Sequence, residues 1–335
     1  MSRQFTILLP FTSPSRLPRE FVSRCNAMNE VWVPSDFSRQ IFIASSVAPS
    51  KLVIVPEGVN TTHFDPANFE PMPLPQASSR HIVGELVFGR QAPKPKADGA
   101  PVMRKVSPLL ACFAGGRRPP PFRFLSTFKW EARKGWDVLL AAYLQEFTSQ
   151  DNVELYIITK PFMSGSNFKQ QMLAWARTAV NKQNLPTLYV VSNHVNDDEF
   201  PRFYRAVDAF VLPSRGEGWG RPHVEAMSMG LPVISTNWSG IQAYLDESVG
   251  YPINTPLLAL IAVSSSDVWW FKGSNWAQPS IQHLRRLMRR VVSQPQEAKV
   301  RGKAARERMV REYSPEALGP FVAQLLRRAD ARIPQ

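Results

Sequence analysis

The sequence predicts an α/β fold built around a doubly wound parallel sheet. From residue 122 onwards, short apolar runs alternate with longer helical patterns, which is typical of parallel strands joined by crossover helices. The predicted strands are 122–128, 153–159, 187–192, 209–212 and 232–235, and the predicted helices are 136–147, 168–183, 199–206, 222–229 and 240–245. Ligands bind at the carboxyl ends of the strands in such a sheet, so the loops that follow strands are the places to search for a site.

The first 68 residues predict a smaller unit of the same kind. Its helices are expected at 19–29 and 36–45 and its strands at 5–9, 30–33 and 51–55, with Ser35 or Asp36 capping the second helix. After residue 280 the sequence predicts three basic helices, broken at Pro295 and Pro315.

Residues 69–121 differ from both regions. They contain ten prolines, and a short apolar stretch at 84–88 is the one strand candidate. We therefore expect a disordered, basic insertion outside the fold. The chain divides into an incomplete N-terminal α/β domain (1–68), this insertion (69–121), a Rossmann-like C-terminal domain (122–313) and a final helix with a tail (314–335).

The formal net charge of +13 is local rather than general. Residues 80–121 carry eight Lys and Arg against two acids, and residues 285–311 carry ten against two. A solvated loop and a basic helical face explain both segments, and nucleic-acid binding is an alternative for which the sequence has no reader motif. No secretory leader and no apolar stretch of about 18 residues are found, so the cytoplasm is the default expectation and the compartment stays unknown.

The two cysteines and five histidines lack metal-ligand spacing, so we expect neither a metal nor a cofactor.

The clearest functional signal is the glycine-rich turn after strand 209–212. Its three glycines let the backbone approach a ligand, and Pro222 suits the first turn of a helix whose free N–H groups attract anions. Glu217 lies in the loop and Glu225 follows eight positions later in the helix. A carboxylate can accept hydrogen bonds from both hydroxyls of a vicinal diol, and a nucleotide sugar offers such diols on its ribose and on its hexose.

The string GEGWGRPHVEAM, with its Glu-x7-Glu spacing, resembles the signature of the family 4 retaining glycosyltransferases of the GT-B fold. The resemblance implies that Glu225 binds the ribose hydroxyls. It also implies that Glu217 and the backbone of Gly218, Trp219 and Gly220 face the transferred sugar. The alternative for Glu225 is a structural role within its helix.

A second match is the basic turn at 126–135, which resembles a Gly-Arg-Leu…Lys-Gly turn that holds the donor diphosphate in this family. Lys129 stands at the Arg position, Lys134 at the Lys position, and Arg133 is an additional cation. Cations at a helix N-terminus repel the helix dipole unless an anion bridges them, and a diphosphate would supply that anion. The alternative is an ordinary charged turn at a helix start.

Weaker matches extend the resemblance over about residues 17–68 and 122–330, nearest to plant and algal members. Residues 57–66 resemble the segment that closes the N-terminal domain, and Asn237 opens a loop that lies beside the nucleotide in the family. The chain departs from the family before residue 69, because neither the glycine-rich acceptor loop nor the catalytic-side histidine of the first domain has a counterpart. The resemblance therefore describes a member with a truncated N-terminal domain.

The resemblance implies a metal-independent hexosyltransferase that uses a nucleoside diphosphate sugar, retains the anomeric configuration and acts on an unknown acceptor. The alternative is a catalytically inactive nucleotide-sugar-binding fragment. The expected catalytic residues are Glu217, Lys134 and Lys129, and the expected donor-binding residues are Glu225, Gly218, Trp219, Gly220 and Asn237.

Overall fold

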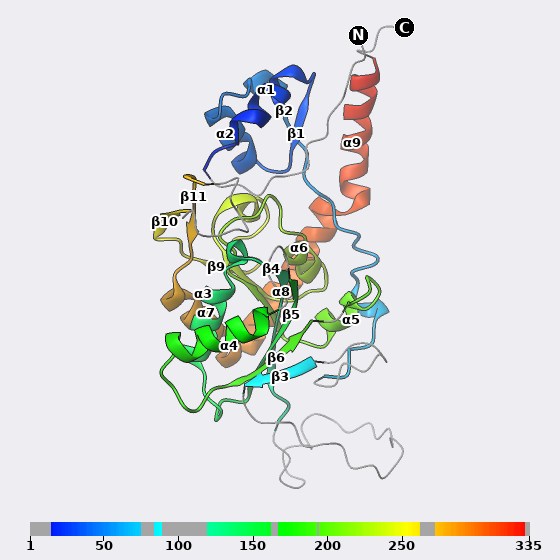
Figure 1. Ribbon diagram of the computed structural model, residues 1–335. Helices are drawn as coiled ribbons and strands as arrows, with labels where there is room; N and C mark the ends of the chain where they lie inside the picture. The colour runs from blue at the N-terminus through cyan, green and yellow to red at the C-terminus, as the bar shows by residue number, and fades with distance from the viewer. Residues whose placement is uncertain are drawn as a thin grey trace.

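The computed structural model describes residues 15–74, 84–88, 119–161, 167–192, 194–261 and 272–331. These residues form a large sheet covered by helices and a smaller α/β unit beside it, drawn in blue in Figure 1. The predicted strand at 5–9 lies outside the described residues.

The large sheet has seven strands in the order β3-β6-β5-β4-β7-β8-β9. They are β3 (Gly84–Phe88), β4 (Phe122–Trp130), β5 (Val153–Pro161), β6 (Thr187–Val191), β7 (Ala209–Leu212), β8 (Val233–Thr236) and β9 (Tyr251–Ile253). All neighbouring pairs are parallel except β3 and β6. The chain winds outwards from β4 to β6 and then restarts beside β4 at β7, so the predicted doubly wound sheet is confirmed. The switch point lies between β4 and β7, where an open α/β sheet binds ligands.

Helices cover both faces of this sheet, because crossovers are right-handed and strands are added in opposite directions on the two sides of the switch point. They are α3 (Trp136–Glu146), α4 (Phe168–Ala179), α5 (Phe200–Arg205), α6 (Arg221–Ser228), α7 (Ile281–Ser293), α8 (Pro295–Tyr313) and α9 (Pro315–Asp330). α3 packs against α4 and α7, whereas α6 packs against α8 (Figure 1). The predicted helix breaks at Pro295 and Pro315 are confirmed. None of the described helices is long and apolar enough to cross a membrane.

Sequence analysis missed β9 and the antiparallel hairpin of β10 (Leu257–Leu260) and β11 (Asn275–Gln278). β9 is three residues long, too short to show a period. β10 is a continuous apolar run whose leucines are largely exposed, so it lacks the alternation that marks a half-buried strand.

The smaller unit contains α1 (Arg19–Ala27), α2 (Asp36–Ala44) and a parallel pair formed by β1 (Val31–Val33) and β2 (Leu52–Ile54). Ser35 is its N-cap as predicted, accepting a hydrogen bond from the N–H of Ser38. The unit has its own small core around the buried Cys25 and Phe42. Phe37 meets Trp238 edge-on with 4.9 Å between ring centroids, which fastens this unit to the loop after β8.

The expectation of a disordered insertion at 69–121 is wrong for the parts that the structure describes. Met72 is 2% exposed, and its N–H donates to the carbonyl of Arg202 over 2.9 Å. Residues 84–88 form β3, because an extended apolar segment can satisfy its backbone groups at the free edge of β6. The remaining residues of the segment, 75–83 and 89–118, lie outside the described residues.

Candidate functional site

The loop from β7 to α6 is buried along its whole length and has a conformation that requires glycine. Gly220 adopts φ +96°, and a Cβ there would lie 2.7 Å from Nδ1 of His223. A Cβ on Gly240, in the loop after β8, would lie 1.9 Å from the carbonyl oxygen of Gly218. The two loops therefore touch through their backbones, and glycine is needed on both sides of the contact.

Glu217 is held through both its backbone and its side chain. Its N–H donates to Oγ of Ser239 over 2.9 Å, and its carbonyl accepts from the N–H of Gly240 over 3.0 Å. Its carboxylate points to the turn before α3, where Oε1 accepts from Nζ of Lys134 over 2.7 Å and Oε2 from Arg133 over 3.1 Å. This turn is the 3₁₀ helix η3 (Ala132–Lys134). The structure thus brings Glu217 and Lys134 together. They are 83 residues apart, so the sequence alone does not indicate that they form a pair.

Burial and ion pairing act in opposite directions on this cluster. Burial raises the pKa of Glu217, but the charges of Lys134 and Arg133 outweigh it and hold the pKa at about 2. Burial and the neighbouring Arg133 lower the pKa of Lys134, and Glu217 opposes that change. Burial also lowers the pKa of Arg133, but Glu217 and Glu131 reverse the effect and raise it. Glu217 therefore supplies, from within the chain, the anion that these cations need at a helix N-terminus.

Glu225 is mostly buried on α6 and has a hydrogen-bond partner of its own. Its Oε2 accepts from the hydroxyl of Tyr204 over 3.2 Å, and its Oε1 lies 3.8 Å from Nε of Arg221. Burial raises the pKa of Glu225, and Arg221 and Tyr204 oppose that change. A carboxylate has about four acceptor positions, so Glu225 retains acceptor capacity for a ligand.

The backbone between these two glutamates offers hydrogen-bond donors. Within the described parts of the chain, no hydrogen bond uses the N–H of Gly218, Trp219 or Gly220. These three consecutive donors lead into the N-terminus of α6, which carries the positive end of the helix dipole. Such an arrangement favours a bound anion.

Trp219 contributes its backbone to this loop, while its side chain belongs to the core. The side chain is 1% exposed and packs against Tyr244 and Tyr313, with ring centroids 5.0 and 5.5 Å away. The hydroxyl of Tyr244 donates to the carbonyl of Trp219 over 2.5 Å. The role of the Trp219 main chain in ligand binding stays a prediction.

Two predicted site residues lie on the surface. Lys129 is exposed near the end of β4, in register with Lys160 of β5. Asn237 is exposed after β8, and its Oδ1 accepts from Gln242 over 3.4 Å. Their roles in ligand binding therefore stay predictions.

His223 lies in the first turn of α6 and is completely buried. Its Nε2 is 2.8 Å from Oγ of Ser235, and its Nδ1 is 3.2 Å from the carbonyl oxygen of Gly220. Burial lowers the pKa of His223 to about 4, although Glu217 opposes this change, so the ring is neutral at pH 7. Through its contact with the carbonyl of Gly220, His223 stabilises the turn at that residue.

Sequence analysis missed Arg215, the residue that fixes the loop to α3. Its guanidinium forms a bidentate pair with Asp137 at 2.8 and 2.6 Å, and it donates to the carbonyl of Ala132 over 2.6 Å. It also lies over the ring of Trp276 in β11, 5.2 Å from the centroid. Arg215 and Asp137 are 78 residues apart, so a single sequence gives no signal that pairs them.

Comparison with known families agrees with this geometry. Residues 119–261, which contain the Glu217 cluster, match the family model described as glycosyl transferases group 1. Mannosylfructose-phosphate synthase of Agrobacterium fabrum is 30% identical over 111 residues, which are 32% of this chain and 24% of that protein. O-antigen chain mannosyltransferase B of Escherichia coli is 48% identical over 44 residues, 13% of this chain and 12% of that protein.

Solved structures resemble the chain over nearly its whole length. Anabaena HepE, solved in complex with UDP and glucose, superposes with a TM-score of 0.62 and 16% identity over 92% of this chain and 66% of that one. Sucrose-phosphate synthase from Thermosynechococcus elongatus gives 0.61 and 17% identity over 93% of this chain and 61% of that one. The fold is therefore the Rossmann-like GT-B fold, and the matches together support a group 1 glycosyltransferase. The chain spans less than two thirds of the length of either structural relative.

Proposed function

We propose that this chain binds a nucleoside diphosphate sugar at the switch point between β4 and β7 and transfers its hexose with retention of configuration. The observation that supports this most is the fixed Glu217 carboxylate beside three backbone N–H donors that are unused within the described residues. A carboxylate next to amide donors suits a ligand that has both hydroxyls and an anionic group. HepE, with the same fold, was solved in complex with UDP and glucose.

In this proposal each part of the donor has a matching group. The backbone donors of Gly218, Trp219 and Gly220 face the transferred sugar and the phosphate oxygens next to it, at the N-terminus of α6. Glu225 accepts hydrogen bonds from the ribose hydroxyls, and Glu217 accepts one from the hexose.

Bond cleavage is assisted by cations in this scheme. Negative charge gathers on the diphosphate as the glycosidic bond breaks, and Lys134, with Lys129 at the outer edge, stabilises that charge. Attack by the acceptor on the face from which the diphosphate departs retains the configuration without an enzyme nucleophile or a metal. Asn237 borders the nucleotide from the loop after β8.

The first experiment measures donor binding by thermal shift across UDP-, GDP- and ADP-sugars, followed by calorimetry with the best ligand. Glu225→Ala should weaken nucleoside diphosphate binding by about 1–3 kcal/mol, because the ribose hydroxyls lose their acceptor. Glu307→Ala on α8 is the matched control, since that glutamate is largely exposed and should change nothing. Equal affinities of Glu225→Ala and the parent would exclude the ribose assignment.

A second experiment separates catalysis from binding. Transfer or hydrolysis of a radiolabelled donor by the parent chain would support the transferase. Tight donor binding without any turnover would support the alternative, a catalytically inactive nucleotide-sugar-binding protein.

A further inference from the structure

Glu57 has an unusual environment for a carboxylate. It lies in the segment that follows β2, and its Oε1 is buried without any hydrogen-bond donor among the residues that the structure describes. A buried acceptor without a donor costs the full desolvation of that group, and most such groups in proteins are paired. Burial also raises the pKa of Glu57, and Arg221 opposes that change. The carboxylate of Glu57 therefore lowers the stability of the folded protein.

Backbone and ring contacts link the segment that contains Glu57 to the Gly218–Gly220 loop through Tyr313. The N–H of Val59, two residues on, donates to the carbonyl of Tyr313 over 2.9 Å, and the ring of Tyr313 packs against Trp219. The charge of Glu57 also contributes to raising the pKa of Tyr244, whose hydroxyl donates to the carbonyl of Trp219. Glu57 thus approaches the loop from the side of the small N-terminal unit.

The surrounding charges restrict what could pair with Glu57. The charge of Arg221 acts on Glu57 and lowers its pKa, and Arg221 also lies 3.8 Å from Glu225 on its own helix. A phosphate would be repelled by the carboxylate, so anionic groups are poor partners. A hydroxyl group is neutral and donates one hydrogen bond, which suits a single free carboxylate oxygen.

We propose that Glu57 is a further ligand-binding residue, which accepts a hydrogen bond from a hydroxyl of the bound nucleotide sugar. This inference rests on the proposed function. It adds a third carboxylate to Glu217 and Glu225, contributed by the N-terminal segment rather than by the large sheet. The hydroxyl belongs either to the ribose or to the hexose.

The test combines stability with binding, because a ligand-binding residue and a structural one behave oppositely. Glu57→Ala removes the unpaired oxygen, so the empty protein should melt at a higher temperature, by about 2 °C. The same variant should bind the best nucleotide sugar about ten-fold more weakly, since a charged acceptor is lost. Glu57→Gln, which keeps a neutral acceptor, should lie between Glu57→Ala and the parent in affinity. Glu70→Gln is the control, an exposed carboxylate further along the same segment, and should match the parent in both measurements.

Calorimetry with related ligands identifies the hydroxyl. If it belongs to the hexose, Glu57→Ala weakens binding of the sugar nucleotide and leaves the nucleoside diphosphate unchanged. If it belongs to the ribose, both ligands weaken equally, and the 2′- or 3′-deoxy nucleoside diphosphate binds parent and variant alike.

Two results would overturn the proposal while leaving the proposed function intact. One is unchanged affinity of Glu57→Ala for every ligand that the parent binds. The other is a fall in its melting temperature, which would show that the carboxylate is paired and structural in the empty protein. A parent chain that binds none of the nucleotide sugars or diphosphates would remove the proposed function and this inference together.

Discussion

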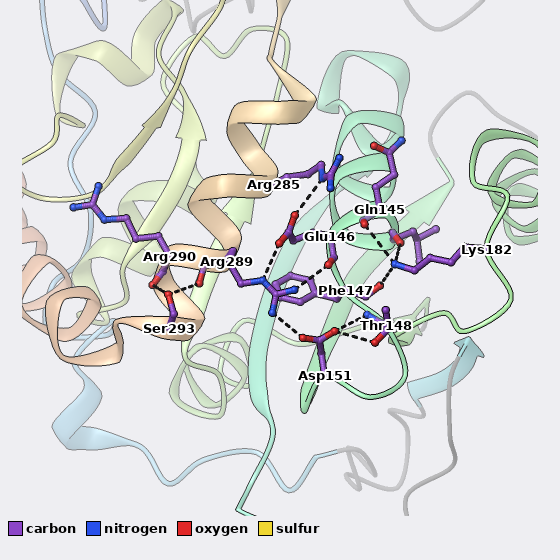
Figure 2. Close-up of polar contacts among 11 residues, drawn as sticks. Gln145, Glu146, Phe147, Thr148, Asp151, Lys182, Arg285, Arg289, Arg290 and Ser293 are labelled. Atoms are coloured by element: carbon purple, nitrogen blue, oxygen red, sulfur yellow. Dashed lines mark hydrogen bonds and ion pairs between the residues drawn. The ribbon is translucent and has the colours of Figure 1, made fainter.

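Helix α3 carries a cluster of cations and carboxylates at each end, and the two clusters differ in burial and in what they join. At the N-terminal end, Glu217 is 4% exposed and pairs with Lys134 and Arg133. At the C-terminal end, Arg289 of α7 donates to Glu146 over 2.8 Å and to Asp151 over 2.7 Å, with 39% of its side chain exposed (Figure 2). The first cluster joins two loops at the carboxyl ends of the strands. The second joins two helices that already pack together.

The helix dipole has opposite effects on the cations of the two clusters. Cations stabilise the carboxyl end of a helix, and there Lys182 donates to the carbonyl of Phe147 over 2.7 Å, as Figure 2 shows, while Arg289 lies over the Phe147 ring. Lys134 and Arg133 stand at the opposite, positive end, where cations are unfavourable. At that end Glu217 compensates the two cations from within the chain, whereas at the other end the dipole itself favours the cations.

The largest effect is expected from Glu217→Ala, because it leaves two buried cations without their shared carboxylate. Removing one partner of a buried ion pair costs about 3–5 kcal/mol of unfolding free energy, which urea denaturation at pH 7 would measure. Glu146→Ala is the comparison variant at the other end of α3 and should cost much less. Equal losses for the two variants would mean that the clusters do not differ as described.

The Glu217 cluster should also show itself in the response of stability to acid. The pKa of Glu217 falls from 4.5 to about 2 on folding, so its contribution to stability is complete above pH 4.5 and is lost as the pH falls towards 2. The stability advantage of the parent over Glu217→Gln should therefore shrink across this range, as followed by urea denaturation at successive pH values. An advantage that persists unchanged at pH 2 would contradict the lowered pKa.

Lys134→Ala should have a smaller effect on stability, since Arg133 still pairs with Glu217, and a specific effect on ligands. A lost charge-assisted hydrogen bond corresponds to about 1.5–3 kcal/mol, so the nucleoside diphosphate should bind roughly ten-fold or more weakly. The free nucleoside has no phosphate and should bind parent and variant equally in calorimetry. Equal weakening of both ligands would show that Lys134 does not bind the diphosphate.

The smallest effect is expected from Arg289→Ala. Partly exposed ion pairs contribute no more than about 1 kcal/mol each and are screened by salt. The variant should lose a little stability at low ionic strength, less at high salt, and should bind nucleotides as the parent does. A clear change in donor affinity would show that the two ends of α3 are coupled.

Local sequence was sufficient for much of the fold. Strand and helix periodicity predicted every strand and α-helix from β4 to β8, because the side-chain repeat of each element depends only on neighbours along the chain. The helix breaks at Pro295 and Pro315 were equally predictable, since proline favours the first turn of a helix and disfavours its interior, although Pro320 lies inside α9. β3 was uncertain, because its pairing depends on the distant edge of β6.

Local sequence features are enough to predict that a glycine-rich loop with Glu217 and Glu225 follows a parallel strand and leads into a helix. These features are local: they are the glycines, the proline at the start of the helix and the spacing of the two glutamates, all of which are seen in a single sequence. The partners of these residues follow from the three-dimensional arrangement: Lys134 and Arg133 for Glu217, and Tyr204 for Glu225. The same arrangement brings Glu57 under the influence of Arg221. The order of the strands brings together loops that are far apart in sequence. A buried charged side chain then pairs with a group of opposite charge on a neighbouring loop, and one sequence does not show which loops are neighbours.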